Sequence, residues 1–247
     1  MIYQHQITEI GTFHLNHCED YALCVDIGQN RQLLAVMDGC TMGDESYFAA
    51  TLFGRLLRKI AKQEFYQEYR TGNIPSLELL LKAVLASLFH ELKLVKNQLQ
   101  LERNELLATL LLAITDTTSG EAEVLCIGDG LVCADGKVIS FDQNNQPDYL
   151  AYHLHKDFSA YYEQLNQRLK FPQVADLSLS TDGILTFADP QGQPASDEQL
   201  TAAMHYLLTD QSDLDNQNMF IKKMSHIKQN WKLLPTDDLG VVRLVMT

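Results

Sequence analysis

The chain alternates between short apolar runs, typical of buried strands, and longer segments whose apolar residues recur at helical spacing. Strands are predicted over about 6–16, 21–27, 32–37, 107–115, 121–127, 131–134, 137–141, 177–180 and 241–246. Helices are predicted over about 44–70, 76–101, 149–169, 196–209 and 212–230. No repeat, low-complexity segment or linker interrupts this order. The pattern therefore predicts one α+β domain over 1–247, with an antiparallel sheet core and helices packed on it.

Two of the predicted strands, 21–27 and 32–37, are separated by a short polar turn and should pair as a hairpin. That pairing places Glu19 and Asp20, just before the first strand, at the same end as Asp38, just after the second. Asp38-Gly39 taken alone is an ordinary turn dipeptide. A carboxylate at the end of a buried strand is costly, however, unless its charge is paired or binds a metal. Hairpin geometry thus predicts a cluster of three carboxylates.

Three further carboxylates, Asp129, Asp182 and Asp237, follow or precede other predicted strands, each beside a glycine or another acid. Hard divalent cations are bound by carboxylate and backbone carbonyl oxygens. Two such ions about 3.5–4 Å apart can bind a phosphate and generate a hydroxide for in-line attack. A plainer interpretation also stays open, in which the acids are only turn residues.

The composition narrows the classes of partner. A formal net charge of −13 argues against nucleic acid and against anionic membrane surfaces. There is no uncharged apolar run of about 18 residues, and the first residues lack the basic and apolar regions of a signal peptide. We therefore expect a cytoplasmic protein with reduced thiols, because no CxxC pair occurs among Cys18, Cys24, Cys40, Cys126 and Cys133.

The motifs that are missing argue against several reaction classes. There is no G-x-G-x-x-G or P-loop for a nucleotide and no G-x-S-x-G for a serine hydrolase. An aspartyl-nucleophile phosphatase would need an acid two residues before Asp38, where Val36 stands. His153 and His155 form a pair, but two ligands do not define a zinc site.

Several motifs in a fixed order resemble the protein phosphatase 2C family, the PPM class of metal-dependent serine/threonine phosphatases. They are Glu19-Asp20, the strand–Asp38-Gly39–helix junction, Ala-Thr-Leu-Leu-Leu-Ala at 108–113, Gly-Asp-Gly at 128–130, Ser-Thr-Asp-Gly at 180–183 and Thr-Asp-Asp-Leu-Gly-Val-Val at 236–242. The resemblance covers essentially the whole chain, and Gly-Asp-Gly is similar to a bacterial branch. It implies a four-layer α-β-β-α sandwich, two antiparallel sheets flanked by helix pairs, with two Mn²⁺ or Mg²⁺ ions at one end.

The resemblance also implies a role for each matched residue. Asp38 would bridge the two metals, with Glu19 and the Gly39 carbonyl on one ion and Asp182 and Asp237 on the other. Catalysis would then proceed through a hydroxide bound between the two ions.

Further assignments follow from the same resemblance. Asp20 would hold metal-bound water, and Asp129 with Asp182 would match a third, weaker metal site. Asp238 would support the ligands without binding a metal itself. The stretch about 143–172 would match a short version of the flap beside the site.

Two positions depart from the family pattern. Cys40 stands where a candidate general acid, His, usually follows Asp-Gly, and a thiol with a pKa near 8.5 is a poor proton donor to an alkoxide. Leu15 stands where the family has its phosphate-binding Arg. His14, His17 and the distant Arg31 are the candidates to replace that Arg, unless nothing does.

The resemblance thus implies a phosphatase that acts on phosphoserine or phosphothreonine in a protein, without a covalent enzyme intermediate. Its partner would be a phosphorylated protein, the substrate of a serine/threonine kinase. The alternative, motivated by the loss of the Arg, is a catalytically weak relative that acts as a phosphate- or metal-sensing binding module.

Overall fold

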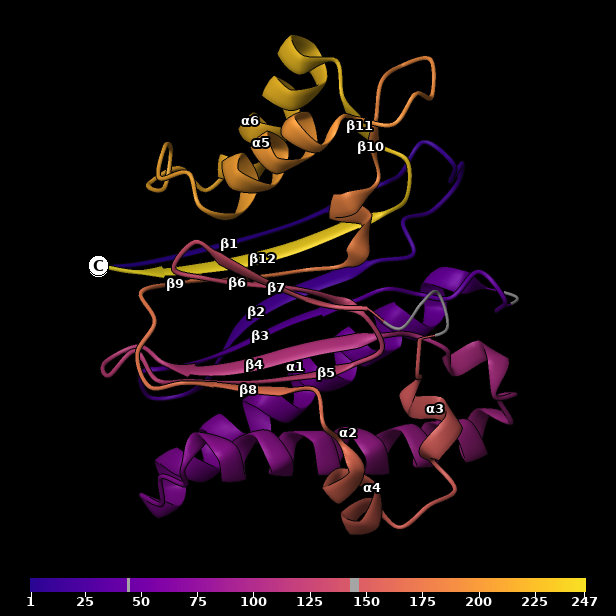
Figure 1. The fold of residues 1–247 in the computed structure, drawn as a ribbon. Coiled ribbons are helices and arrows are strands. Elements are labelled where there is room, and N and C mark those ends of the chain that lie inside the picture. Colours follow the sequence, from indigo (N-terminus) through magenta and orange to yellow (C-terminus); the bar gives the residue numbers. More distant parts are fainter. Residues whose placement is uncertain (44, 143–146) are drawn as a thin grey trace.

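The computed structural model describes residues 1–43, 45–142 and 147–247, and its elements stack in four layers (Figure 1). Two five-stranded antiparallel sheets lie face to face in the middle. One helical layer covers the outer face of each sheet, as Figure 1 shows. The predicted four-layer α-β-β-α sandwich is therefore confirmed.

The first sheet has the strand order β1 (Ile2–Glu9), β12 (Leu239–Met246), β9 (Asp176–Ser180), β6 (Gly130–Ala134), β7 (Lys137–Phe141). The predicted strand over 6–16 is displaced in the structure. Its pairing with β12 runs from Ile2 opposite Met246 to Glu9 opposite Leu239, and this long-range register sets its bounds. Residues 10–20 are consequently a loop at one end of the sandwich.

The second sheet has the order β2 (Tyr21–Gly28), β3 (Arg31–Met37), β4 (Leu110–Asp116), β5 (Ala122–Ile127), β8 (Arg168–Phe171). The predicted hairpin is confirmed, with Tyr21 opposite Met37. Strand β3 is apolar at successive positions because both of its faces are covered. Leu33 packs toward the helices, whereas Leu34 and Val36 pack into the core between the sheets.

The helix pair α1 (Ser46–Thr71) and α2 (Leu77–Leu99) covers the second sheet and is followed by the short 3₁₀-helix η1 (Asn104–Leu106). Ser76 caps α2 as predicted, since its hydroxyl accepts a hydrogen bond from the N–H of Leu79 at 3.3 Å. The amphipathic pattern of both segments thus predicted that they are helices and which of their faces is buried.

The helices α5 (Asp197–Leu208) and α6 (Met219–His226) cover the first sheet, and α6 continues as one π-helical turn, η3 (Ile227–Trp231). The predicted helix over 212–230 begins later than expected. Asp213 has a left-handed backbone (φ 59°), which interrupts any helix before Met219. The 3₁₀-helix η2 (Asp182–Leu185) and the two-stranded pair β10 (Phe187–Ala188) and β11 (Leu234–Pro235) complete this half.

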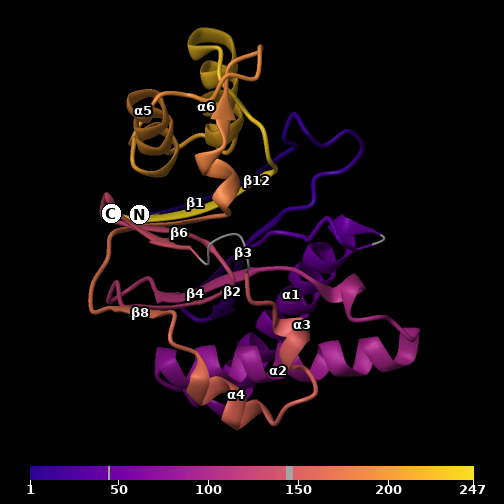
Figure 2. The same ribbon diagram turned by 45° about the vertical axis from the view of Figure 1, so that its right-hand side comes forward.

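The stretch predicted as a helix over 149–169 is instead α3 (Leu150–His153), α4 (Phe158–Gln164) and strand β8. The helix prediction fails at its end because residues 168–171 pair with β5, where Phe171 lies opposite Ala122. Figure 2 shows α3 and α4 alongside α2. The beginning of the predicted flap, residues 143–146, lies outside the described residues. Within the described ranges, no helix has the length and apolar character needed to cross a membrane.

Candidate functional site

The β2–β3 hairpin brings the first three predicted carboxylates to one end of the sandwich. The N–H of Gly39 donates to the carbonyl of Glu19 at 3.2 Å, which ties the residue after Asp38 to the residue before Asp20. A Cβ at Gly39 would lie 2.3 Å from the carbonyl oxygen of Ser46, so only glycine fits this junction. The N–H of Asp38 in turn donates to the hydroxyl of Thr109, at 3.1 Å.

Two later strand ends add carboxylates to this cluster. Asp182 starts η2 directly after β9, and Asp237 precedes β12, which pairs with β9. Burial, followed by the charges of Asp129 and Asp237, raises the pKa of Asp182 to about 6. Asp129 therefore lies close enough for its charge to act on Asp182, and the third metal site that the resemblance implies for this pair stays a prediction.

The pKa values of Asp20 and Asp38 are raised well above the ordinary range for aspartate. Burial is the first cause for both. The negative charge of Asp182 raises both pKa values, and Asp237 adds to the effect on Asp38. Carboxylates gathered in this way repel one another, and a divalent cation among them would relieve the repulsion.

Glu19 and Asp20 each have one carboxylate oxygen without a hydrogen-bond partner among the described residues. Glu19 accepts a hydrogen bond from the hydroxyl of Ser46 through Oε1, while its buried Oε2 has no partner. Asp20 accepts from Thr181 at 2.7 Å through Oδ2, while its buried Oδ1 has none. Buried oxygens without partners, in an all-oxygen donor set, fit hard cations such as Mn²⁺ or Mg²⁺.

The distances between these carboxylates also decide whether they can hold a metal ion. Across residues 1–43, 45–142 and 147–247, no group of three or more His, Cys, Asp or Glu side chains is positioned to hold a metal ion. The carboxylates are therefore gathered and chemically suited to cations, but their positions are not those of a loaded site.

Asp238 fastens the 10–20 loop to the start of β12. Its buried carboxylate accepts from the N–H of Gly11 at 2.7 Å and from the N–H of Glu19. The loop that carries Glu19 is thus held by the carboxylate of Asp238. The role that the resemblance implies for Asp238, support of the ligands without binding a metal, stays a prediction.

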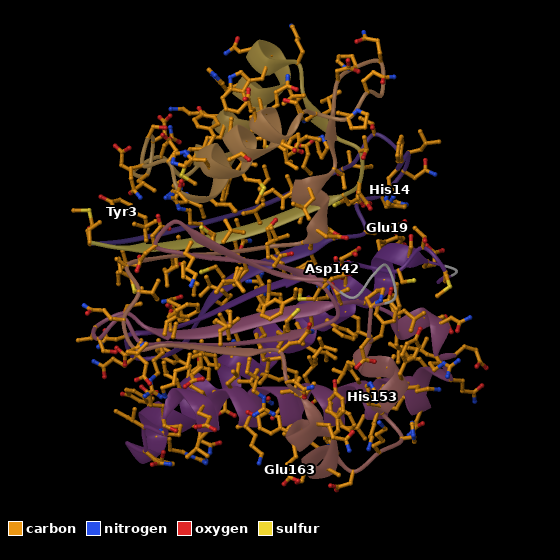
Figure 3. All side chains as sticks on the ribbon, viewed as in Figure 1. Tyr3, His14, Glu19, Asp142, His153 and Glu163 are labelled. Carbon is orange, nitrogen blue, oxygen red and sulfur yellow. The ribbon has the colours of Figure 1, made fainter. Side chains whose placement is uncertain are left out.

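His14 lies among the carboxylates, next to Glu19 at the end of the sandwich (Figure 3). Its Nδ1 is 3.0 Å from Asp238 Oδ2, and its Nε2 is 3.4 Å from Asp237 Oδ1. Nδ1 is also 3.6 Å from Glu19 Oε1. His14 therefore bridges the two loops that carry Glu19 and Asp237.

The other candidates to replace the phosphate-binding Arg differ in position. Leu15, at the Arg position, is 90% exposed and offers no polar group. The ring of His17 packs on Tyr47, with centroids 4.6 Å apart, in the wall of a cavity of about 530 Å³ that Glu19 also lines. Arg31 was wrong as a candidate. It opens β3, pairs with Asp116, and lies a strand length of about 20 Å from Asp38.

Sequence reasoning missed Tyr149, which reaches the site from the N-terminal end of α3. Its hydroxyl is hydrogen-bonded to the side chain of Cys40. Burial is the first cause that raises the pKa of Tyr149, followed by Cys40 and then by the charges of Asp38 and Asp129. No signal in the sequence marks this residue, because its position depends on how the segment folds back.

Asp142 was also missed. Burial raises the pKa of Asp129, and the charge of Asp142 adds to it. Figure 3 places Asp142 at the same end of the sandwich as Glu19. By contrast, the candidate zinc pair diverges. His153 bonds Asp148 at 2.7 Å and stacks on Tyr161, whereas His155 lines a different surface.

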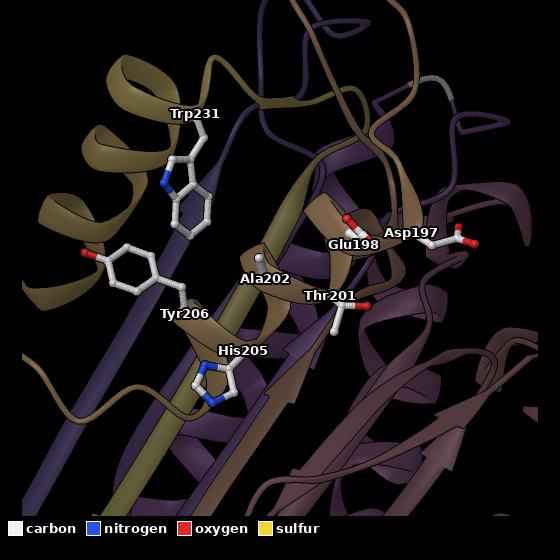
Figure 4. Close-up of a pocket in the computed structure, with 7 residues that line it drawn as sticks. All are labelled: Asp197, Glu198, Thr201, Ala202, His205, Tyr206 and Trp231. Atoms are coloured by element: carbon white, nitrogen blue, oxygen red, sulfur yellow. The ribbon is translucent and has the colours of Figure 1, made fainter.

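A cavity of about 700 Å³ lies away from this cluster, on α5 and η3 (Figure 4). Trp231, Tyr206 and Ala202 form part of its wall, with Asp197 and Glu198 at the start of α5. It contains none of the strand-end carboxylates, so size alone does not identify the functional site.

Comparisons with known proteins agree with the fold and with the family that the sequence resembles. The family model described as protein phosphatase 2C matches residues 10–219. No curated protein matches the chain significantly in sequence.

Solved structures are similar in fold at low identity. The phosphatase domain of the cell fate determinant SpoIIE from Bacillus subtilis, with a fragment of its regulatory domain, is 16% identical (TM-score 0.59). That match covers 99% of this chain and 63% of the other. The serine/threonine phosphatase Stp1 from Staphylococcus aureus is 12% identical over 100% of this chain and 96% of its own (TM-score 0.61). The RsbU and RsbW domains of Rv1364c from Mycobacterium tuberculosis are 14% identical over 99% and 59% (TM-score 0.57).

Proposed function

Because the chain belongs to the protein phosphatase 2C family, we propose that it hydrolyses phosphoserine or phosphothreonine in a protein substrate, with the help of divalent cations. One observation carries this proposal. Glu19 and Asp20 each keep one buried oxygen without a partner, beside a cluster in which Asp38 and Asp182 have raised pKa values. Such oxygens suit hard cations.

The assignment of ligands follows the family pattern. Asp38 would bridge two Mn²⁺ or Mg²⁺ ions, and Glu19 with the Gly39 carbonyl would serve one of them. Asp182 and Asp237 would serve the other. When bound, the two ions would supply an activated water for direct attack on phosphorus, without a covalent enzyme intermediate.

Two more acids complete the assignment. Asp20 would hold water at the ions, and Asp129 with Asp182 would form a third, weaker site. The charge of Asp129, which raises the pKa of Asp182, supports this pairing.

The chain's own hydrogen bonds orient these ligands. Ser46 holds Glu19, and Thr181 holds Asp20. Asp238 fixes the loop on which Glu19 lies. Such contacts to the ligands set how well a metal site is organised.

Cys40 and the phosphate contact are the points at which this chain departs from its family. The hydrogen bond with Tyr149 engages the Cys40 side chain, so we assign Cys40 to packing at the site and not to proton donation. His14 is engaged by carboxylates. His17 has no carboxylate within ion-pair distance in the described part of the chain, and we take it as the candidate phosphate contact.

The cellular compartment and the source of the substrate are also part of the proposal. All five cysteines are free thiols, which suits a reducing cytoplasm. A serine/threonine kinase would supply the phosphorylated protein substrate. Residues 1–247 would then act as a single phosphatase domain, with the stretch about 143–172 as its flap.

Hydrolysis of p-nitrophenyl phosphate with Mn²⁺ or Mg²⁺, from pH 6 to 9, tests the enzyme. Metal-dependent turnover is expected, and turnover no faster than a metal-free blank at every pH would refute it.

The second candidate, a phosphate- or metal-binding module with weak catalysis, is favoured by the exposed Leu15 at the Arg position. Calorimetric Mn²⁺ binding without turnover would select that candidate.

A further inference from the structure

A basic cavity of about 370 Å³ lies between the C-terminal part of α2 and helix α3. Figure 2 shows these two helices as neighbours. The cavity is lined by Lys93, Lys96, Arg103 and His155, together with Asn97 and Tyr152, and by no carboxylate of the described residues. The cavity on α5 has two carboxylates, and the one beside His17 also has two. In a chain of net charge −13, a cavity whose charged lining side chains are lysines and an arginine is a local reversal of charge.

Within the described residues, the ammonium groups of the two lysines donate hydrogen bonds only to backbone carbonyls, and that of Lys93 also lies 4.5 Å from the ring centroid of Phe89. Lys93 Nζ donates to the carbonyl of Lys156 at 3.1 Å, and Lys96 Nζ donates to that of Leu101 at 2.7 Å. Both side chains are half-buried. Among the residues that the structure describes, no carboxylate lies within 4.0 Å of either ammonium. Their positive charges are therefore partly removed from water without a compensating acid.

Capping of α2 explains part of this arrangement but not all of it. A lysine near a helix C-terminus stabilises the free carbonyls and the negative end of the dipole, which accounts for one N–H of Lys96. Arg103 has no such role, because it follows the helix. Its guanidinium stands 5.3 Å over the ring of Tyr152, and none of its N–H groups has a hydrogen-bond partner within the described residues.

A stacked guanidinium is well suited to bind an anion. The aromatic ring holds the planar fork in place, and the fork offers paired N–H groups to a carboxylate or a phosphate. Lys93 and Lys96 each keep N–H groups free beyond their carbonyl bond. The three cations together provide the charge and the donors for one anionic group.

The cavity is connected to the proposed active site through two tyrosines. The ring of Tyr152, under Arg103, packs edge-on against Tyr149 with centroids 5.4 Å apart. Tyr149 is hydrogen-bonded to Cys40, which follows Asp38-Gly39. From the other side, the carbonyl of Leu107, just after η1, accepts from the N–H of Cys40 at 3.1 Å. These contacts link the Arg103 end of the cavity to the segment that carries Asp38.

We propose that this basic cavity binds an acidic group of the phosphoprotein substrate, a carboxylate or a second phosphate that flanks the residue being dephosphorylated. The proposal rests on the proposed phosphatase function and names its substrate class, phosphorylated segments with acidic flanks. The negative charge of the protein repels acidic segments from the rest of its surface, so they would bind at the basic cavity.

Three phosphoserine peptides of one length test this proposal, one with glutamates in the flank, one with glutamines, and one with a second phosphoserine. The double variant K96Q/R103Q is compared with R58Q/K62Q, which also removes two cations from an exposed surface, that beside Asp26. In the unaltered protein, kcat/KM should be higher for both acidic peptides than for the glutamine peptide. K96Q/R103Q should lose about tenfold on the acidic peptides, the effect of losing a charge-assisted hydrogen bond.

The controls separate the cavity from the catalytic machinery. K96Q/R103Q should leave the glutamine peptide and p-nitrophenyl phosphate unchanged, and R58Q/K62Q should leave all four substrates unchanged. Equal kcat/KM values for the three peptides, or a preference that survives K96Q/R103Q, would overturn the proposal. If only the bis-phosphorylated peptide is preferred, phosphate is the group bound. If the glutamate peptide is preferred as well, carboxylate suffices.

Binding measured by fluorescence anisotropy distinguishes failure of this proposal from failure of the proposed function. Salt-sensitive binding of the labelled acidic peptides, weakened in K96Q/R103Q, would support the cavity even in a chain that hydrolyses nothing. Turnover of p-nitrophenyl phosphate without any difference in peptide binding between the variants would instead support the phosphatase function and refute the role proposed for the cavity.

Discussion

The Nδ1 atom of His14 lies 3.0 Å from a carboxylate oxygen of the buried Asp238. The same carboxylate accepts hydrogen bonds from the backbone of Gly11 and Glu19. A single side chain therefore organises the loop that carries one predicted metal ligand and the histidine that touches two of them.

Replacing Asp238 by Ala should loosen that loop. The N–H groups of Gly11 and Glu19 would lose their partner, which costs about 2–3 kcal/mol of unfolding free energy. Mn²⁺ affinity should fall about 10–100-fold, as for other groups that orient ligands. Urea denaturation and calorimetric titration measure the two effects. Asp215→Ala, at an exposed position of the 211–218 turn, is the control and should change neither.

Replacing Asp38 by Asn should separate metal binding from folding. The neutral amide removes a buried negative charge that Asp20, Asp182 and Asp237 all oppose. We expect the metal-free variant to be at least as stable as the unaltered protein, while Mn²⁺ binding and turnover are lost. Thermal unfolding in chelator, with and without added Mn²⁺, provides the measurement. A variant that still gains stability from Mn²⁺ would contradict the assignment of Asp38 as the bridging ligand.

Replacing Gly39 by Ala should disturb the junction between β3 and the cluster. The new Cβ would lie 2.3 Å from the carbonyl oxygen of Ser46 and 2.8 Å from that of Glu19, so the backbone must shift. Overpacking of this kind costs about 1–3 kcal/mol. Gly43→Ala is the milder comparison, because its nearest neighbour, the carbonyl oxygen of Asn104, is 3.2 Å away. Equal urea midpoints for the two variants would rule out this explanation of Gly39.

Stability should fall in acid through Asp210, which lies far from the carboxylate cluster. Burial opposes its charge, but hydrogen bonds from Ser212 and Lys223 outweigh burial and lower the pKa of Asp210 to about 2. Because its unfolded pKa is about 3.9, its contribution is present above pH 4 and is lost as the pH falls toward 2. The free energy of unfolding should therefore decline over that window.

Asp210→Asn should flatten that decline, and Asp189→Asn, which alters an acid of the loop after β10, should not. Burial lowers the pKa of the Lys223 ammonium, which is fully buried, whereas the carboxylate of Asp210 is partly exposed. An identical acid slope in Asp210→Asn and the unaltered protein would contradict this account.

Much of the fold was predictable because its signals are local. The β2–β3 hairpin, with Glu19 and Asp20 at the same end as Asp38, follows from two apolar runs and a short turn. The hairpin between β6 and β7 turns at Asp135-Gly136, where both residues have positive φ, as the Asp-Gly dipeptide predicts. The helical spacing of α1 and α2 specified which faces are buried.

Errors arose where a partner distant in the chain decides the structure. Strand β8 carries Arg168 and Lys170 and resembles a helix end in sequence, yet hydrogen bonds to β5 make it an edge strand. Strand β1 takes its bounds from β12, more than 200 residues away in the chain. Neither register can be derived from local periodicity, because the strand that pairs with β8 or β1 lies far away in the sequence.

The sequence by itself determined the carboxylates and the order of strands that delivers them, since each acid adjoins a glycine or another acid at a strand end. Only the tertiary structure decided what surrounds them. His14 lies against Asp237 and Asp238, Arg31 lies at the far end of β3, and Tyr149 reaches Cys40. The reason is physical: a strand fixes where its own ends lie, whereas loops and flap helices are placed by packing and hydrogen bonds to elements far away in the chain.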